Sequence, residues 1–390
     1  MSFIRNFAKA FVSELRLAIH DQGILVFLIL LPFAYPILYS IIYNPEFARD
    51  VAVVVVDNDR TFLSRELARN LNACQEVEII GYAADLDEAK RAMDSRKCFA
   101  IIEIPEGFQR TVGRGETANA IFYSDMSLLI RYKGVLTATT NVALAMGSEL
   151  QAKKINDIAP LAATLTSGDP MPVESRELGN TQGGFDSFLM PGVLILILQQ
   201  ATVLAVGMAG GARREKNLYS EGNNMSLPTW VLGRAACFAT LFMIPAIYIC
   251  HYVPLMFSFP MAGNELEIFA FVLPLLIASV MMGLCLQGIV SERESIFVIW
   301  VVTSIMFLFL SGLTWPRYAM SPIWKTLADC VPATFGVLGF VKMNSNGASL
   351  SQVAPCYTAL WIQAAVYTAI AMIIQYRLRT RNTIPSRQSI

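Results

Sequence analysis

The sequence predicts an α-helical polytopic membrane protein with six transmembrane helices and an inserted extracytoplasmic mixed α/β domain. Of its 390 residues, 55% are hydrophobic and only 15% are charged, whereas a soluble domain carries about 25% charged residues. The apolar residues also gather in runs long enough to cross a hydrocarbon core of roughly 30 Å. One long segment between two of these runs has the composition of a soluble domain instead.

The first 22 residues predict an amphipathic helix that lies in the membrane surface. One helical stripe carries the apolar residues, and the basic residues lie off it: Phe3, Phe7, Phe11, Leu15 and Ile19 form the stripe, and Arg5, Lys9 and Arg16 flank it. A secretory signal is the alternative interpretation. The apolar run that follows is too long for a signal, and no A-x-A cleavage pattern follows it.

Residues 24–43 form the first apolar run, in which Pro32 and Pro36 are expected to kink a transmembrane helix. Residues 44–185 predict the α/β domain. Strands are expected at Val51–Val56, Val77–Gly81, Cys98–Ile104 and Ala118–Tyr123, and helices at Leu86–Met93 and from Leu128 towards Ile158. Such alternation predicts a small mixed sheet with helices packed on it.

The turn Asp57-Asn58-Asp59 follows the first strand of this domain. Its carboxylates could be metal ligands, but turn capping is the favoured interpretation because no other acidic cluster completes a site. Thr61 or Ser64 is expected to cap the next helix, which runs to Ala73, with Glu66 in its first turn. Residues 160–184 are rich in Gly, Pro, Ser and Thr and predict a linker back to the membrane.

Residues 187–376 predict transmembrane helices two to six. The runs are Ser187–Gly210, Trp230–Phe257, Ile268–Val290, Ile296–Trp315 and Ala354–Tyr376. Residues 316–343, between the fifth and sixth helices, contain Pro316, Pro322 and Pro332. This segment is too broken for a spanning helix and predicts an outer re-entrant segment.

The distribution of Lys and Arg predicts the orientation. The short flanks on the amino-terminal side hold Arg5, Lys9, Arg16, Arg213, Arg214, Lys216, Arg293, Arg377, Arg379, Arg381 and Arg387, and the opposite short loops hold only Arg317, Lys325 and Lys342. Both termini, including the tail 377–390, are therefore expected in the cytoplasm. The α/β domain is expected outside.

Composition and motifs exclude several classes of function. The 30 Lys and Arg balance the 30 Asp and Glu, so no basic excess points to nucleic acid. Two histidines and seven cysteines without a CxxC pair predict no metal or redox centre and no catalytic residue. Cys74 and Cys98 could form a disulfide in an oxidising compartment, and their spacing leaves this open.

No Walker A loop is present, and no cytoplasmic segment is long enough for a nucleotide-binding domain. An ATP-driven function would therefore need an ATPase on another chain. The charge cluster at Arg214, Glu215, Lys216 and Glu221 could be a coupling helix that docks on such a partner. Simple positive-inside anchoring is the alternative.

Three polar residues lie inside the apolar runs, namely Gln199, Gln200 and His251. Polar side chains are costly against lipid, so they should face other helices or a water-filled translocation path. Interhelical hydrogen bonds are the plainer interpretation, and the sequence leaves both open.

Four stretches resemble the permease subunits of ABC-2 type exporters, in particular the drug-export-like subgroup with a large periplasmic domain after the first transmembrane helix. They are Val53–Leu71, the Ile-Pro-Glu-Gly-Phe region within Asp85–Gly115, the loop Arg214-Glu215-Lys216 with Pro228 and Leu232-Gly233-Arg234, and Ser311–Pro316, which contains Gly312 and Trp315. The sequence departs from the family pattern at Asn217–Gly222, which follows the coupling loop.

The resemblance implies the membrane-spanning subunit of an exporter that moves an amphipathic or hydrophobic substrate out of the cytoplasm or inner leaflet. It implies a bacterial inner-membrane location, a cytoplasmic ABC ATPase that binds ATP and Mg, and a second permease copy or paralogue. A periplasmic adaptor is a further candidate partner. The chain itself would bind no cofactor, and membrane lipid would surround it. The alternatives are a non-transporting membrane scaffold that binds proteins through its outer domain, and an ion-driven transporter.

Overall fold

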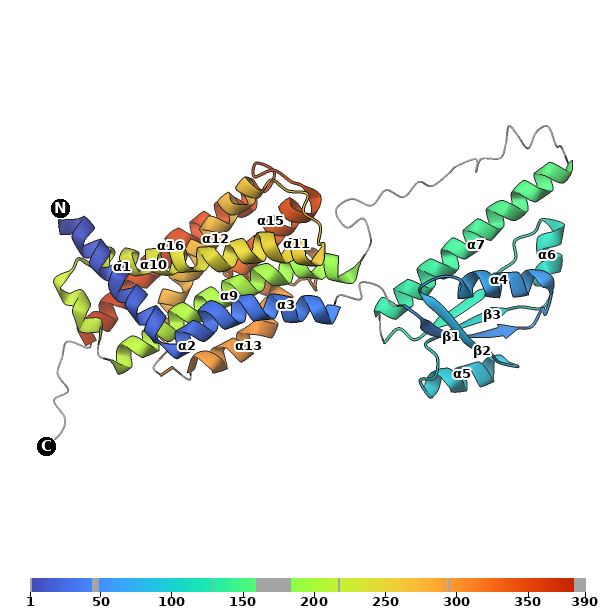
Figure 1. Ribbon diagram of the computed structural model, residues 1–390, viewed down its shortest axis with the longest axis horizontal. Coiled ribbons are helices and arrows are strands. Elements are labelled where there is room, and N and C mark those ends of the chain that lie inside the picture. The colour runs from blue at the N-terminus through green and yellow to red at the C-terminus, as the bar shows by residue number, and fades with distance from the viewer. Residues whose placement is uncertain are drawn as a thin grey trace. The chain divides into compact units, whose positions relative to one another are not determined.

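The computed structural model describes residues 2–43, 49–127, 129–158, 184–216, 218–290, 292–293 and 295–381. The chain divides into two compact units (Figure 1). The helical unit comprises Met1–Asn44 and Glu177–Ile390, and the α/β unit comprises Pro45–Arg176. The predicted linker at residues 160–184 lies outside the described residues except for Gly184, which precedes helix α9.

Five helices of the described residues are long and apolar enough to cross a membrane. They are α2–η1–α3 (Gln22–Leu25, Val26–Leu30, Leu31–Tyr43), α9 (Phe185–Glu215), α10–η3–α11 (Leu227–Ile247, Tyr248–Tyr252, Val253–Phe257), α12 (Glu265–Leu286) and α16 (Ala354–Arg381). A sixth results if α14 (Pro322–Asp329) and α15 (Pro332–Asn346), which meet at 86°, form one broken span. The chain is thus a polytopic helical membrane protein with a small sheet.

Helix α13 (Ser295–Leu310) is shorter than the fifth transmembrane helix expected at Ile296–Trp315. The expectation is wrong at its end because the chain turns at Gly312, which has a φ of +84°. This left-handed conformation favours glycine. Pro316 then precedes the short helix η4 (Arg317–Ala319).

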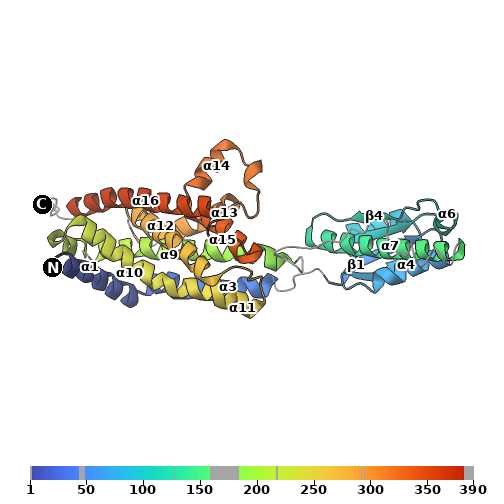
Figure 2. The same ribbon diagram turned by 90° about the horizontal axis from the view of Figure 1, so that it is seen from above.

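Helix α9 is the centre of the helical unit, since it packs against α3, α12, α13 and α15 (Figure 2). Nearly every side chain between Met190 and Arg213 is buried. A Cβ atom added to Gly283 of α12 would lie 2.7 Å from Cβ of Val206 on α9. The absence of a side chain at Gly283 therefore permits the close approach of these two helices.

The α/β unit contains a four-stranded sheet in the order β2-β1-β3-β4. Strand β1 (Val51–Asp57) is parallel to β2 (Val77–Tyr82) and β3 (Ala100–Ile104), and β4 (Ile121–Ser124) is antiparallel to β3. Helices α4 (Phe62–Asn72), α6 (Phe108–Arg114) and α7 (Leu129–Ile158) contribute to the apolar core on one face, and α5 (Leu86–Asp94) covers the other. The predicted mixed sheet is confirmed.

The turn after β1 uses both of its carboxylates as structural acceptors. Asp57 accepts the hydroxyl of Ser64 at 2.8 Å, and Asp59 accepts the backbone N–H groups of Gly107 at 2.8 Å and Gln109 at 3.0 Å. Asp57 also accepts the backbone N–H groups of Asp59 at 3.1 Å and Arg60 at 2.9 Å, so the turn-capping interpretation is confirmed.

Thr61 caps α4, and Ser64 completes the capping box. The first-turn place expected for Glu66 is wrong because α4 begins at Phe62, which makes Ser64 the third helical residue. Cys74 and Cys98 are free thiols. Cys74 packs against the core that α4 and α7 share, and Cys98 lies in the core under α5, so the sheet separates them.

Candidate functional site at one end of the helical unit

Parts of six helices meet at one end of the helical unit, which we call the α1 end. Helix α1 (Ser2–His20) lies there, together with the ends of α9, α12 and α16, the start of α10 and the connecting helix η2 (Leu218–Asn224) (Figures 1 and 2). All the residues of the predicted coupling cluster belong to this end.

Helix α1 packs on α10 through a face that the sequence analysis did not single out. Its buried residues are Ala10, Glu14, Leu17 and Ala18. Gly233 of α10 lies so close that an added Cβ would be 2.7 Å from Cβ of Ala10. The predicted apolar stripe Phe3, Phe7, Phe11, Leu15 and Ile19 is half-buried or exposed, and Arg5, Lys9 and Arg16 are exposed.

Five polar residues form a fully buried group that we call the buried polar cluster: Glu14, Arg213, Arg234, Gln287 and Gln375. One oxygen of Glu14 accepts Nε–H of Arg213 at 2.8 Å and Nε–H of Arg234 at 2.9 Å. Arg234 also donates to the amide oxygens of Gln375 at 2.9 Å and Gln287 at 3.0 Å. The cluster therefore joins α1, α9, α10 and α16 to Gln287, which follows α12.

The electrostatics of this cluster keep Glu14 ionised. Burial raises the pKa of Glu14, but the adjacent guanidinium groups of Arg213 and Arg234 outweigh burial and hold that pKa below its usual value. Both guanidinium groups also lie over the Trp230 ring, 4.9 and 5.4 Å from its centre. Removing one partner of a buried ion pair costs about 3–5 kcal/mol, because the other charge is left uncompensated.

A second set of ion pairs, less buried, lies at the same end. Arg293, between α12 and α13, contacts Asp21 at 2.8 Å and Glu215 at 2.5 Å. Lys216 lies 3.5 Å from Asp21. Asp21 also accepts the N–H of Ile24 and so caps α2 at the break after α1. The end of α9 and the α12–α13 connection are thus linked to this break.

The predicted coupling residues divide between these contacts. Glu215 and Lys216 belong to the second set of ion pairs, whereas the Arg214 guanidinium donates to the carbonyl of Gln287 at 2.9 Å. Glu221 belongs to η2, and its side chain lies outside the described residues.

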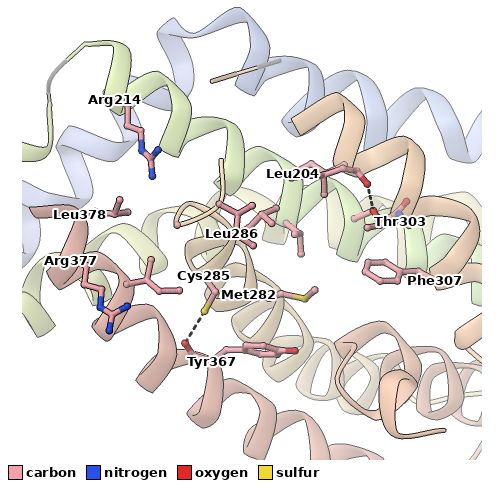
Figure 3. Close-up of a pocket in the computed structure, with 16 residues that line it drawn as sticks. Leu204, Arg214, Met282, Cys285, Leu286, Thr303, Phe307, Tyr367, Arg377 and Leu378 are labelled. Carbon is pink, nitrogen blue, oxygen red and sulfur yellow. Dashed lines mark hydrogen bonds between the residues drawn. The ribbon is translucent and has the colours of Figure 1, made fainter. Parts of the chain in front are cut away.

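A cavity of about 670 Å³ lies between α9, α12, α13 and α16 (Figure 3). Its wall is mostly apolar, with Met282, Phe307 and Tyr367 among the lining residues. Arg214 and Arg377 lie on the same side of it, opposite Phe307. Such a cavity has the size and character of a ligand pocket.

Of the three polar residues considered for a translocation path, only Gln200 is among the described residues that line this cavity. Gln199 is buried, with Nε2 3.8 Å from the sulfur of Met282. His251 lies outside the cavity lining, where Nδ1 is 3.1 Å from a carboxylate oxygen of Glu265.

The predicted re-entrant segment contains the bent pair α14–α15. Gly312 forms the turn before it, and Trp315, next to Pro316, is 54% exposed. Arg317 forms an ion pair with Asp329, and the side chain of Gln363 on α16 donates to the carbonyl of Asp329 at 2.7 Å. The segment is therefore anchored to the last long helix.

The sequence analysis missed Glu14, Gln287 and Gln375, and it counted Arg213 only as an anchor. A usable signal was present. Glu14 is the one acidic residue of the basic helix α1, and Arg234 lies inside an apolar run. Charged groups at such positions need a partner of opposite charge.

A family model described as "ABC-2 family transporter protein" matches residues 23–373. This chain therefore belongs to the ABC-2 transporter family and is a membrane transporter subunit rather than an enzyme. Members of this family generally work with a cytoplasmic ATPase and dimerise. The chain is also 22% identical over 372 residues to the linearmycin resistance permease protein LnrN of Bacillus subtilis (strain 168). That similarity covers 88% of this chain and 93% of LnrN.

Proposed function

We propose that this chain is the permease subunit of an ATP-driven exporter, which moves an amphipathic or hydrophobic substrate out of the cytoplasm or the inner leaflet. Family membership and the permease description of LnrN support this proposal. The main structural support for the proposal is the buried polar cluster, because this cluster connects the end of α9, beside the coupling loop, to α1, α10 and α16.

In the proposed orientation the α1 end faces the cytoplasm of a bacterial inner membrane. The positive-inside rule supports this orientation, since ten described Lys and Arg residues of the short flanks belong to this end: Arg5, Lys9, Arg16, Arg213, Arg214, Lys216, Arg293, Arg377, Arg379 and Arg381. Both termini are then cytoplasmic, six segments cross the membrane, and the α/β unit lies outside.

The proposed mechanism is a shift between two arrangements of the helices. ATP-driven closure of two ATPase chains moves the segment that follows α9. Arg213 and Lys216 transmit this movement to Glu14 and Asp21, and therefore to α1 and the break after it. The ATPases bind ATP and Mg, and a second permease copy or paralogue completes the translocation path.

Reconstitution tests this proposal. The permease, co-purified with the ABC ATPase of its cell, is expected to stimulate ATP hydrolysis and to support export that survives collapse of the ion gradient. Loss of export on gradient collapse, with ATP present, would favour an ion-driven transporter instead. A stable outer protein partner without a bound ATPase would favour the scaffold.

A further inference from the structure

The cavity between α9, α12, α13 and α16 has a polarised lining. Its apolar wall includes Val203, Leu204, Met282, Leu286, Ile299 and Phe307. Two arginines, Arg214 and Arg377, are its cationic groups, and none of its described lining residues is acidic. A ligand that fits this lining has a long apolar part and an anionic end.

The two guanidinium groups have capacity for such an anion. Arg214 donates to one backbone carbonyl, that of Gln287, and pairs with no carboxylate among the described residues. Arg377 forms no side-chain hydrogen bond or ion pair within the part of the chain that the structure describes, and it is exposed. Arginine holds carboxylate and phosphate groups through paired N–H donors.

The lengths of the helices fit an acyl chain. Gln200 and Arg214 both line the cavity and are separated by 14 positions on α9, which corresponds to roughly 21 Å at 1.5 Å per residue. Tyr367 and Arg377 on α16 are 10 positions apart, or roughly 15 Å. The apolar wall therefore extends from the arginines for about the length of a membrane lipid chain.

We propose that this cavity binds a single-chain anionic amphiphile. Arg214 and Arg377 hold its carboxylate or phosphate head group, and its acyl chain lies between α9, α12, α13 and α16. Such a molecule could be exported cargo or a lipid of the surrounding membrane. Binding of this ligand does not depend on the proposed export function. Only the transport measurement described below rests on that function.

The test uses palmitic acid with a photoreactive diazirine in its chain, and the matching alcohol as a neutral probe. Both are added to the purified full-length permease in neutral detergent, without ATPase. We expect the acid to label peptides that contain Met282 or Tyr367, and the alcohol to label them far less. Equal labelling by acid and alcohol, or labelling confined to the exposed positions Val298 and Ile305 of α13, would overturn the proposal.

Variants test the two parts of the site separately. Arg214→Gln with Arg377→Gln should reduce labelling by the acid about fivefold or more, because the charge-assisted contacts are lost. Arg379→Gln is the matched control, since its guanidinium donates to the carbonyl of Met225 and does not line the cavity. Labelling that the double variant leaves unchanged contradicts the proposed head-group site.

The apolar part is tested by filling the cavity. Thr303→Trp should abolish labelling, whereas Val301→Trp, at a 66% exposed position of α13, should not. Thermal unfolding shows whether each variant is folded. If Thr303→Trp is misfolded, labelling of the arginine variants tests the proposal instead. Full labelling of a folded Thr303→Trp variant would place the ligand elsewhere and overturn the proposal.

Vesicles that contain the permease and its ATPase distinguish the two sources of the ligand. ATP-dependent movement of the acid across the membrane identifies cargo. Retention of the acid with a changed ATPase rate identifies a bound lipid, and both results support the site. Export that continues normally while the acid fails to bind would overturn this inference and leave the proposed function intact.

Discussion

Glu14 is the residue on which two buried arginines from different helices converge. Its carboxylate accepts hydrogen bonds from both Arg213 and Arg234 and has no exposure to solvent. Buried ionic groups gain little net stability over apolar residues, but they are costly to break and restrict the arrangement of the helices around them. We therefore expect Glu14 to hold α1 in one position on α10.

Replacement of Glu14 tests this role. Glu14→Gln removes the negative charge and leaves two guanidinium groups buried, so it should lower the stability of the helical unit by about 3–5 kcal/mol. Thermal unfolding in detergent measures the loss. Lys9→Gln, at an exposed position of the same helix, is the control and should unfold like the unchanged protein. An equal unfolding temperature for both variants would contradict the assigned role.

The lowered pKa of Asp59 predicts that acid destabilises the α/β unit. Partial burial raises the pKa of Asp59, but hydrogen bonds from Thr61 and from the backbone of Gln109 and Gly107 outweigh it and lower that pKa. A lowered pKa stabilises the fold above the usual carboxylate pKa of about 3.9. This stabilisation is lost as the pH falls through the folded-state value.

Asp59→Asn should therefore lower the stability of the α/β unit at pH 7 by about 1 kcal/mol and weaken its dependence on acid pH. Limited proteolysis of the full-length protein between pH 7 and pH 3 measures both effects. Asp94→Asn is a suitable control, because Asp94 is exposed and has no side-chain hydrogen bond in the described structure. The idea fails if the two variants resist proteolysis equally at every pH.

At the scale of elements, Arg293 connects three segments. It contacts Asp21 at the break between α1 and α2, and Glu215 at the end of α9. The segment between α12 and α13 is thus in contact with both of the elements through which the proposed ATPase would act. A movement at the end of α9 would reach α13 by this route.

Arg293→Gln should uncouple ATP hydrolysis from export. Arg293 is 27% exposed, and Asp21 keeps its contacts with Lys216 and with the N–H of Ile24 when Arg293 is replaced, so the variant should remain folded. Export per ATP hydrolysed in reconstituted vesicles is the measurement. Glu292→Gln, an exposed neighbour without an ion pair in the described residues, should leave this ratio unchanged. A normal ratio in Arg293→Gln would exclude the coupling role.

The elements differ in how well the sequence predicted them. The strands of the α/β unit and its helices α4, α5 and α7 were predicted to within a few residues, because β-branched runs and polar turns mark them, whereas the short helix α6 was not predicted. The end of α13 was not, since Ser311 and Gly312 continue the apolar run while the backbone turns there. Hydropathy does not distinguish a turn made of small residues from a further helical turn.

The candidate site was predicted only in part. The sequence indicated the charged end of α9. It did not indicate that Arg213 and Arg234 share Glu14 as a partner, because Glu14 lies 199 and 220 positions away from them in the chain. The stripe of phenylalanines on α1 directed attention away from the face that carries Glu14. Contacts over such separations depend on how the helices pack, and one sequence does not contain that information.

At the scale of the whole molecule, the proposed topology predicts which residues are accessible from each side. Each variant would carry one added cysteine, Glu106→Cys or Arg5→Cys, with Cys74 and Cys330 replaced by Ser to lower background labelling. In intact spheroplasts, a membrane-impermeant maleimide should label Glu106→Cys at once. Arg5→Cys should be labelled only after the membrane is opened. The opposite pattern would invert the topology and remove the basis for cytoplasmic coupling.

The shared carboxylate of Glu14 also has a consequence for biogenesis. A ribosome adds about 5–20 residues per second, so the 220 residues that separate Glu14 from Arg234 take on the order of 10–40 s to synthesise. During this interval the nascent chain carries an acidic group whose binding site does not yet exist, and α1 must wait among the lipid head groups. Only chains released before the end of α9 is made would leave that charge without either arginine, since Arg213 is synthesised before Arg234.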